Sequence, residues 1–302
     1  MLKKNTKDPI NGVLLLDKAL GVSSNTALQQ VRRVFNAKKA GHTGVLDPLA
    51  TGLLPVCFGE ATKFAQYLLD ADKAYIATLK VGEATTTADA EGEVIETAAV
   101  TFSATDFADA CAQFTGTILQ KPPMYSALKF QGKSLYEYAR QGIEIERKQR
   151  EVTIYGIEIL SFELPIIKIA VSCSKGTYIR TLAEDLAKKV GSVAHLIALR
   201  RTKTAGFNIE STYLFEQLAK YTQAQLFQTL LPCDVLVAHL PEYLFSFEQV
   251  AQLKYGQNVQ VIENYGKMQV FRIYDANHQF IGLAEHNGVD SFRAVRLMNT
   301  SV

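Results

Sequence analysis

One segment of the chain, residues 41–55, gathers the residue types with which a protein could carry out chemistry on a bound molecule. It reads GHTGVLDPLATGLLP, and His42 and Asp47 are its only titratable side chains. Glycine permits close approach to the backbone, and Pro48 restricts Asp47 to an extended or turn conformation. The segment is therefore predicted to be a shaped loop that presents both side chains. Its predicted anchors are five apolar residues that need burial: Val45, Leu46, Leu49, Leu53 and Leu54.

Asp47 taken alone could be a nucleophile, a general base or a turn cap. The three glycines and two prolines around it favour a functional loop over a simple turn. Arg180 is the second candidate, because it lies in GTYIRT, where a strand is predicted to meet a helix. Its planar, permanently charged guanidinium suits a carboxylate. Arg180 could thus keep Asp47 ionised and aimed, or it could instead grip a phosphate.

Two tyrosines and a histidine could present flat rings to a ligand. Tyr75 and Tyr178 lie at predicted strand edges, where stacking on a nucleobase contributes about 1–3 kcal/mol, although core packing is the commoner role of a strand tyrosine. No second His, Cys or carboxylate stands near His42 at metal spacing, so His42 is predicted to be an acid/base or stacking group. The chain also lacks P-loop, dinucleotide and HExxH motifs, which predicts chemistry without a cofactor.

Composition indicates a globular protein with a large domain and a small one. The chain has 302 residues, of which 48% are hydrophobic. No apolar run has the length of a membrane span, and no secretion signal is recognisable at the N-terminus. The four cysteines are far apart and are predicted to be reduced, mostly buried thiols of a cytoplasmic protein.

Charge is segregated along the chain although the net charge is only +2. Residues 121–150 contain seven Lys/Arg and three Asp/Glu, and residues 175–203 contain seven and two. Residues 60–109 contain three and ten. This distribution favours one basic face for a polyanion, although ordinary solvated helix faces would give a similar pattern.

Hydrophobic periodicity predicts an α+β chain. The predicted strands cover residues 11–18, 75–81, 152–162 and 166–173, with a loop and strand through 199–209. The predicted helices cover residues 23–35, 60–69, 106–114, 134–140 and 181–190. Short strands at 259–262, 268–274, 280–285 and 292–298 predict a small β-rich unit. We therefore place a catalytic domain at residues 1–238 and a second domain at 239–302.

Five blocks of the sequence, in order, resemble the TruB family of tRNA pseudouridine synthases. They are residues 41–55, LDK at 16–18 with GVSS at 21–24, KAY at 73–75, PPMYSA at 122–127, and GTYIRT at 176–181 with LRRT at 199–202. The resemblance covers about residues 10 to 210, and Ala19 departs from the proline that is usual there. That change is predicted to affect loop stiffness only. The C-terminal part resembles, more weakly, the PUA-like domain of bacterial members.

The resemblance implies a pseudouridine-synthase fold with a mainly antiparallel mixed sheet flanked by helices, and isomerisation of uridine 55 in the TΨC arm of elongator tRNAs. It implies that Asp47 is the nucleophile, that Tyr75 stacks on the base and takes its C5 proton, and that Arg180 pairs with Asp47. The substrate-site residues that it implies are His42, Tyr178 and Leu199, with Lys18 supporting the loop. It further implies tRNA, through its T stem-loop, as the partner, and a monomer that needs no other protein.

Physical chemistry agrees with this implied reaction. The isomerisation is redox neutral, and reaching the base requires flipping it from the stack at a cost of a few kcal/mol. Aromatic and arginine surfaces suit splayed RNA loops, and basic segments would bind phosphates in a salt-dependent way. Two alternatives stay open: a non-catalytic tRNA-binding protein on the same scaffold, and a glycosidase that releases uracil without reattaching it.

Overall fold

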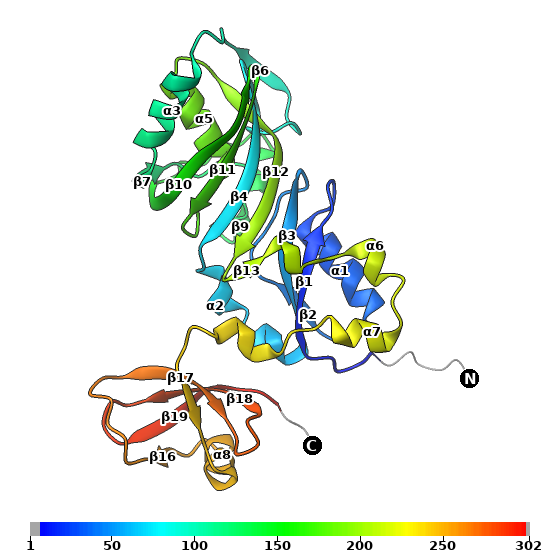
Figure 1. Ribbon diagram of the computed structural model, residues 1–302, viewed down its shortest axis with the longest axis vertical. Helices are drawn as coiled ribbons and strands as arrows, with labels where there is room; N and C mark the ends of the chain where they lie inside the picture. Colours follow the sequence, from blue (N-terminus) through cyan, green and yellow to red (C-terminus); the bar gives the residue numbers. More distant parts are fainter. Residues whose placement is uncertain (1–6, 300–302) are drawn as a thin grey trace.

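The computed structural model describes residues 7–299 and contains two units, each built on its own sheet (Figure 1). In that range ten strands form the larger sheet, in the order β14-β1-β3-β12-β4-β11-β10-β7, with β2 beside β3 and β13 beside β12. Their bounds are β1 Gly12–Lys18, β2 Ala40–His42, β3 Ala50–Phe58, β4 Lys73–Val81, β7 Gly116–Gln120, β10 Arg150–Glu163, β11 Ile166–Cys173, β12 Ala194–Thr204, β13 Phe207–Asn208 and β14 Tyr213–Leu214. Only the β1–β14 and β3–β12 pairs are parallel among these described strands. The predicted mixed, mainly antiparallel sheet is confirmed.

Helices cover one face of this sheet in two groups (Figure 1). Helix α1 (Ser24–Val34) packs on β1 and β3, and helices α3 (Ala104–Gln113) and α5 (Ile179–Lys189) pack on β4, β10 and β11. Shorter helical segments are η1 Gly59–Lys63, α2 Gln66–Leu69, α4 Leu135–Ala139, η2 Ile209–Ser211, α6 Phe215–Leu218, α7 Gln223–Gln228 and η3 Cys233–Val237. Helix α5 also contacts β12. Between the two groups of helices, Tyr75 of β4 and Leu199 and Arg201 of β12 line a cavity, and this is where the site lies.

The first strand and helix follow their sequence signals closely. β1 is buried on both faces, because Leu14 and Leu16 join the helix-side core while Val13 and Leu15 join a second core on the opposite face. That explains a continuous apolar run instead of alternation. Ser23 caps α1 by accepting a hydrogen bond from the Thr26 amide at 3.1 Å.

The second unit packs against the opposite face of the large sheet. Within the described residues it is a five-stranded sheet, β15-β17-β18-β19-β16, with bounds β15 Glu242–Leu244, β16 Val259–Gln260, β17 Gln269–Tyr274, β18 Phe280–His286 and β19 Ser291–Leu297. Leu283 of β18 joins the core formed by β1, β3, η1 and η3. Lys63 also donates to the Leu297 carbonyl at 2.9 Å. The predicted β-rich C-terminal unit is confirmed, with two additions, strand β15 and helix α8 (Phe247–Lys254).

The prediction of one loop over residues 41–55 is wrong in its second half. Only residues 43–49 form the loop, and Ala50–Phe58 is the buried strand β3. Gly52 serves close packing, because a Cβ there would lie 2.3 Å from the Arg201 carbonyl oxygen. The Pro55 carbonyl accepts a hydrogen bond from the Thr43 amide of the loop, so this edge of Pro55 faces away from β1. The Pro55 nitrogen lies on the same edge, beyond the last residue of β3 that pairs with β12. A proline fits here because no strand pairing requires an N–H at this position.

Two smaller predictions also need correction. Val45 was predicted to be buried but is 57% exposed, since it sits at the tip of the loop. Residues 60–69 were predicted as one helix but form the separate segments η1 and α2, with Phe64 and Leu68 buried against the second core. The other segments in the described range are two small hairpins, β5 Glu83–Thr85 with β6 Val94–Thr97, and β8 Lys129–Phe130 with β9 Lys133–Ser134.

Candidate active site

The loop that carries Asp47 is held from both sides by elements of the first core. The buried Ser24 hydroxyl, at the start of α1, donates to the Leu46 carbonyl at 3.0 Å and accepts from the Leu46 amide at 2.8 Å. On the other side of Asp47, the Pro48 carbonyl accepts from the Gly21 amide at 2.8 Å. The residues flanking Asp47 are therefore fixed, as positioning of a reactive group requires.

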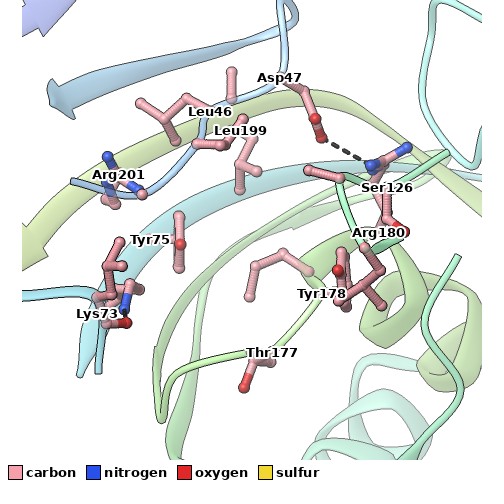
Figure 2. Close-up of a pocket in the computed structure, with 18 residues that line it drawn as sticks. Leu46, Asp47, Lys73, Tyr75, Ser126, Thr177, Tyr178, Arg180, Leu199 and Arg201 are labelled. Carbon is pink, nitrogen blue, oxygen red and sulfur yellow. Dashed lines mark hydrogen bonds and ion pairs between the residues drawn. The ribbon is translucent and has the colours of Figure 1, made fainter. Parts of the chain in front are cut away.

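Asp47 forms an ion pair with Arg180 of α5, with 2.9 Å between Oδ2 and Nη2 (Figure 2). Arg180 is only 6% exposed and makes three further contacts. It donates to the Thr87 carbonyl at 3.0 Å and to the Tyr125 carbonyl at 2.7 Å, and its Nη1 lies 3.5 Å from Oδ2 of Asp89. A buried guanidinium with this many acceptors has one available orientation. Arg180 thus sets the position of the Asp47 carboxylate.

The Asp47 side chain is 40% exposed, so its carboxylate remains reachable from the cavity. Burial raises the pKa of this carboxyl above its ordinary value of 3.8, and the like charge of Asp89 acts in the same direction. Arg180 and Lys18 oppose the rise with their positive charges. Opposed effects of this kind are typical of functional carboxylates.

A cavity of about 430 Å³ opens beside Asp47 on the helix-covered face of the sheet. Its floor comes from the central strands, with Tyr75 on β4 and Leu199 on β12, and Tyr178 and Arg180 line it from the start of α5 (Figure 2). The sequence-predicted residues Asp47, Tyr75, Tyr178, Arg180 and Leu199 are therefore brought together. The volume lies within the range of small-ligand sites, and the lining combines rings, an apolar side chain and an ion pair.

Tyr178 is positioned through its backbone. The buried Gln120 side chain accepts from the Tyr178 amide at 2.8 Å and donates to its carbonyl at 3.0 Å. This pair of hydrogen bonds connects the end of β7 to the start of α5. Burial raises the pKa of the Tyr178 hydroxyl, and the positive charges of Arg150 and Arg180 oppose that rise.

His42 and Lys18 lie outside this cavity. The His42 ring lines a neighbouring hollow of about 570 Å³ that shares Asp47 and Arg180 with the cavity. Its Nδ1 donates to the Gly44 carbonyl at 2.8 Å, and burial lowers its pKa. Lys18 is 1% exposed and donates to the carbonyls of Val22 at 2.5 Å and Pro48 at 3.5 Å. Burial lowers the Lys18 pKa to about 8. Because its amine bonds the Pro48 carbonyl, Lys18 supports the loop that carries Asp47.

Two residues at the site were not found by sequence reasoning. Asp89 lies in a polar turn with several other acidic residues, and nothing in its local sequence distinguishes it. Arg201 was noted only as part of the LRRT block, and it lines the cavity from β12. Among residues 7–299, no cluster of three or more His, Cys, Asp or Glu could hold a metal ion.

Comparison with known proteins identifies the family. The model of the TruB family pseudouridylate synthase N-terminal domain matches residues 32–179, and two C-terminal models, of tRNA pseudouridylate synthase B and of pseudouridine synthase II TruB, match residues 180–238 and 241–298. The chain belongs to the TruB family of pseudouridylate synthases. It is therefore an enzyme, an isomerase, as predicted.

Full-length relatives agree with this TruB assignment. The chain is 57% identical to tRNA pseudouridine synthase B of Neisseria meningitidis serogroup A over 302 residues, covering 100% of this chain and 99% of the relative. It is 50% identical to the protein of that name from Chromobacterium violaceum over 296 residues, covering 98% and 97%. The match thus includes both units of the TruB fold.

Solved structures show the same fold at low sequence identity. A chain from the Cbf5-Nop10-Gar1 complex superposes with a TM-score of 0.73 at 24% identity, covering 95% of this chain and 85% of that one. A chain from an H/ACA RNP bound to a substrate RNA containing 2'-deoxyuridine gives a TM-score of 0.72 at 22% identity, covering 96% of this chain and 86% of that one.

In the described part of this TruB-family chain, no helix is long and apolar enough to cross a membrane.

Proposed function

We propose that this chain isomerises uridine 55 in the TΨC arm of elongator tRNAs to pseudouridine, with Asp47 as the nucleophile. The observation that carries this proposal is the Asp47–Arg180 ion pair at the edge of a ring-lined cavity. The relatives named tRNA pseudouridine synthase B support tRNA as the substrate. Arg180 keeps Asp47 ionised, and the fixed loop aims the carboxylate at a base that has left the stack.

Each further residue has a role in this proposal. Tyr75 stacks on the flipped uracil and accepts its C5 proton, while Tyr178 and Leu199 enclose the base from the side. His42 occupies the space that the base leaves in the RNA, and Lys18 holds the loop. Between loss of the N1 bond and formation of the C5 bond the base rotates in the cavity, so a flat, partly apolar lining favours retention over release.

The two units divide the work in this proposal. Residues 1–238 carry the chemistry, and residues 239–302 form a PUA-like domain that contacts RNA. The basic segments 121–150 and 175–203 border the cavity through Ser126 and Arg180 and would bind phosphates of the T stem-loop. The protein acts in the cytoplasm as a monomer and needs no cofactor or protein partner.

The decisive experiment replaces Asp47 with Asn. Asparagine keeps the shape but cannot attack, so tritium release from [5-³H]uridine-labelled tRNA should fall on the order of 10⁴-fold or more. The affinity for tRNA should change little. Asp109→Asn, on the exposed side of α3, is the matched control and should retain full activity. Retained turnover in Asp47→Asn would refute the assignment of the nucleophile.

The same assay separates the alternatives. A non-catalytic tRNA-binding protein would bind tRNA without releasing tritium. A glycosidase would liberate free uracil, and the RNA would lose mass. Isomerisation leaves the mass unchanged, so mass analysis of the product decides between the last two.

A further inference from the structure

Arg201 is a buried cation for which the described protein provides no counter-anion. Its side chain is the largest among the fully buried ones, at 1% exposure. Nε donates to the Leu53 carbonyl at 2.7 Å, whereas Nη2 is buried without a hydrogen-bond partner. Among residues 7–299, no ion pair within 4.0 Å involves Arg201. Burying an unpaired charge is costly, so this arrangement indicates a use for the charge.

The backbone places this cation beside Tyr75. Arg201 on β12 is the direct antiparallel partner of Tyr75 on β4, so the two side chains project from the same face of the sheet. Both line the cavity that contains Asp47 (Figure 2). Above them, a Cβ built on Gly44 would lie 3.4 Å from Arg201 Nη1. The guanidinium is thus enclosed between the catalytic loop and the tyrosine.

We propose that Arg201 acts through Tyr75 as a positioning residue, fixing the phenol group and stabilising its oxygen in the anionic form, so that this oxygen can accept the C5 proton of the substrate base. The inference rests on the proposed function, which makes Tyr75 the proton acceptor. Arg201 serves a different purpose from Arg180, because its charge is not already matched by carboxylates.

The step balances without a further reactant. Once C5 is joined to the ribose, the C5–H bond breaks and its proton passes to the Tyr75 oxygen, which is a phenolate at that moment. The electron pair of the C5–H bond forms the C5–C6 double bond, and the π pair of the C6=N1 double bond moves onto N1. N1 takes a proton from solvent, and Tyr75 later returns its proton to solvent, which regenerates the phenolate fraction.

Electrostatics around the Tyr75 hydroxyl support this role. Burial raises its pKa, the positive charge of Arg201 lowers it, and Cys173 on β11 and Asp47 on the loop raise it. Removing Arg201 therefore raises the Tyr75 pKa further. At any pH below that pKa, the phenolate fraction falls and proton release slows.

A double-variant cycle tests whether the two residues act together. General-base catalysis contributes roughly 10²–10⁴-fold, so Tyr75→Phe should slow single-turnover tritium release by about that factor. Arg201→Met should slow it by about 10- to 100-fold in the wild-type background and by less than about twofold in Tyr75→Phe. Equal losses in both backgrounds would overturn the inference. Arg32→Met is the control, since Arg32 of α1 also donates to backbone carbonyls, of Ala37 at 3.3 Å and of Lys38 at 2.9 Å, but lies outside the cavity and the basic segments.

Direct titration of the Tyr75 hydroxyl distinguishes the proposed role from a purely structural one, because a purely structural role of Arg201 would leave the Tyr75 pKa unchanged. With 3-fluorotyrosine incorporated and the Tyr75 ¹⁹F signal assigned by its loss in Tyr75→Phe, the Tyr75 pKa should be higher in Arg201→Met than in the wild type. An unchanged pKa, or a loss confined to tRNA affinity, would instead make Arg201 a contact for substrate phosphate and refute the proposal.

A third variant guards against misfolding. If Arg201→Met does not fold, Arg201→Lys should show a smaller loss that likewise disappears in Tyr75→Phe, and a loss that persists there would refute the proposal. Absence of tritium release from the wild-type enzyme would refute the proposed function itself. An active wild type with additive variants would refute only the role of Arg201.

Discussion

The two walls of the cavity hold an arginine each, and they treat its charge in opposite ways. On the loop side, Arg180 lies between the carboxylates of Asp47 and Asp89, with two backbone carbonyls completing its contacts. On the strand side, Arg201 has one backbone carbonyl and a tyrosine neighbour. The first guanidinium is neutralised before any substrate arrives. The second has charge that remains to be matched during the reaction.

The walls also differ in what positions them. The loop wall depends on side chains from distant elements, such as the bonds from Ser24 to Leu46. The strand wall depends on the register of β12 against β4, which the backbone ladder fixes. Single side-chain changes should therefore disturb the loop wall more easily. The variants below test the loop wall, and Arg201→Met tests the strand wall.

Among the changes to the partners of Asp47, Arg180→Lys should have the largest effect. Lysine keeps the charge but cannot reach both carboxylates with one planar group. Single-turnover activity should fall on the order of 10²- to 10³-fold with little change in melting temperature. Arg272→Lys is the control, because that arginine also bonds a carbonyl and a carboxylate but in the C-terminal unit. Unchanged activity would show that the Asp47 ion pair is dispensable.

A smaller loss is expected for Asp89→Asn. The variant removes one of the two carboxylates that pair with Arg180 and leaves the other, Asp47, in place. Arg180 is then held less firmly, so single-turnover activity should fall by roughly 10- to 100-fold. Asp106→Asn provides the comparison, since Asp106 in α3 also accepts local hydrogen bonds, from Ser103 directly before that helix. If both variants retain wild-type rates, Asp89 does not contribute to the alignment of Arg180.

Ser24→Ala should have a modest effect. It leaves the Leu46 amide and carbonyl without their buried partner, at a cost of about 1–3 kcal/mol, and the Asp47 loop gains freedom. Activity should fall by about three- to tenfold. Ser103→Ala removes a cap of similar worth, about 1 kcal/mol, far from the site. If both variants lose the same melting temperature but Ser24→Ala loses more activity, the role of the Ser24 hydrogen bonds is confirmed. Equal activities of the two variants would contradict it.

The smallest effect concerns pH. Asp47 must be ionised to attack, and burial raises its pKa above 3.8, so activity should decline with falling pH at values above 3.8. Asp89 contributes to that rise by like-charge repulsion. The acid limb of the single-turnover rate should therefore move to lower pH in Asp89→Asn. A limb that stays in place or moves to higher pH would mean that Asp89 does not act on Asp47 through its charge.

Local sequence predicted the elements whose signals are short-range. The apolar run of β1, the Ser23 cap of α1 and the strands β10 and β11 were found because periodicity and capping act within a few residues. β3 was missed for the opposite reason. Its glycine and its proline are typical of a loop, and only the close approach of Arg201 to Gly52 and the hydrogen bond from the Thr43 amide to the Pro55 carbonyl explain them.

The sequence by itself determined which side chains could carry the chemistry: an aspartate on a constrained turn, tyrosines at strand edges and an arginine at a helix start. Tertiary structure decided which of them meet. The Asp47–Arg180 contact, the recruitment of Asp89 and the placement of Arg201 beside Tyr75 all join elements far apart in the chain. The physical reason is that ion pairs and strand registers depend on distances in space, which no local pattern encodes.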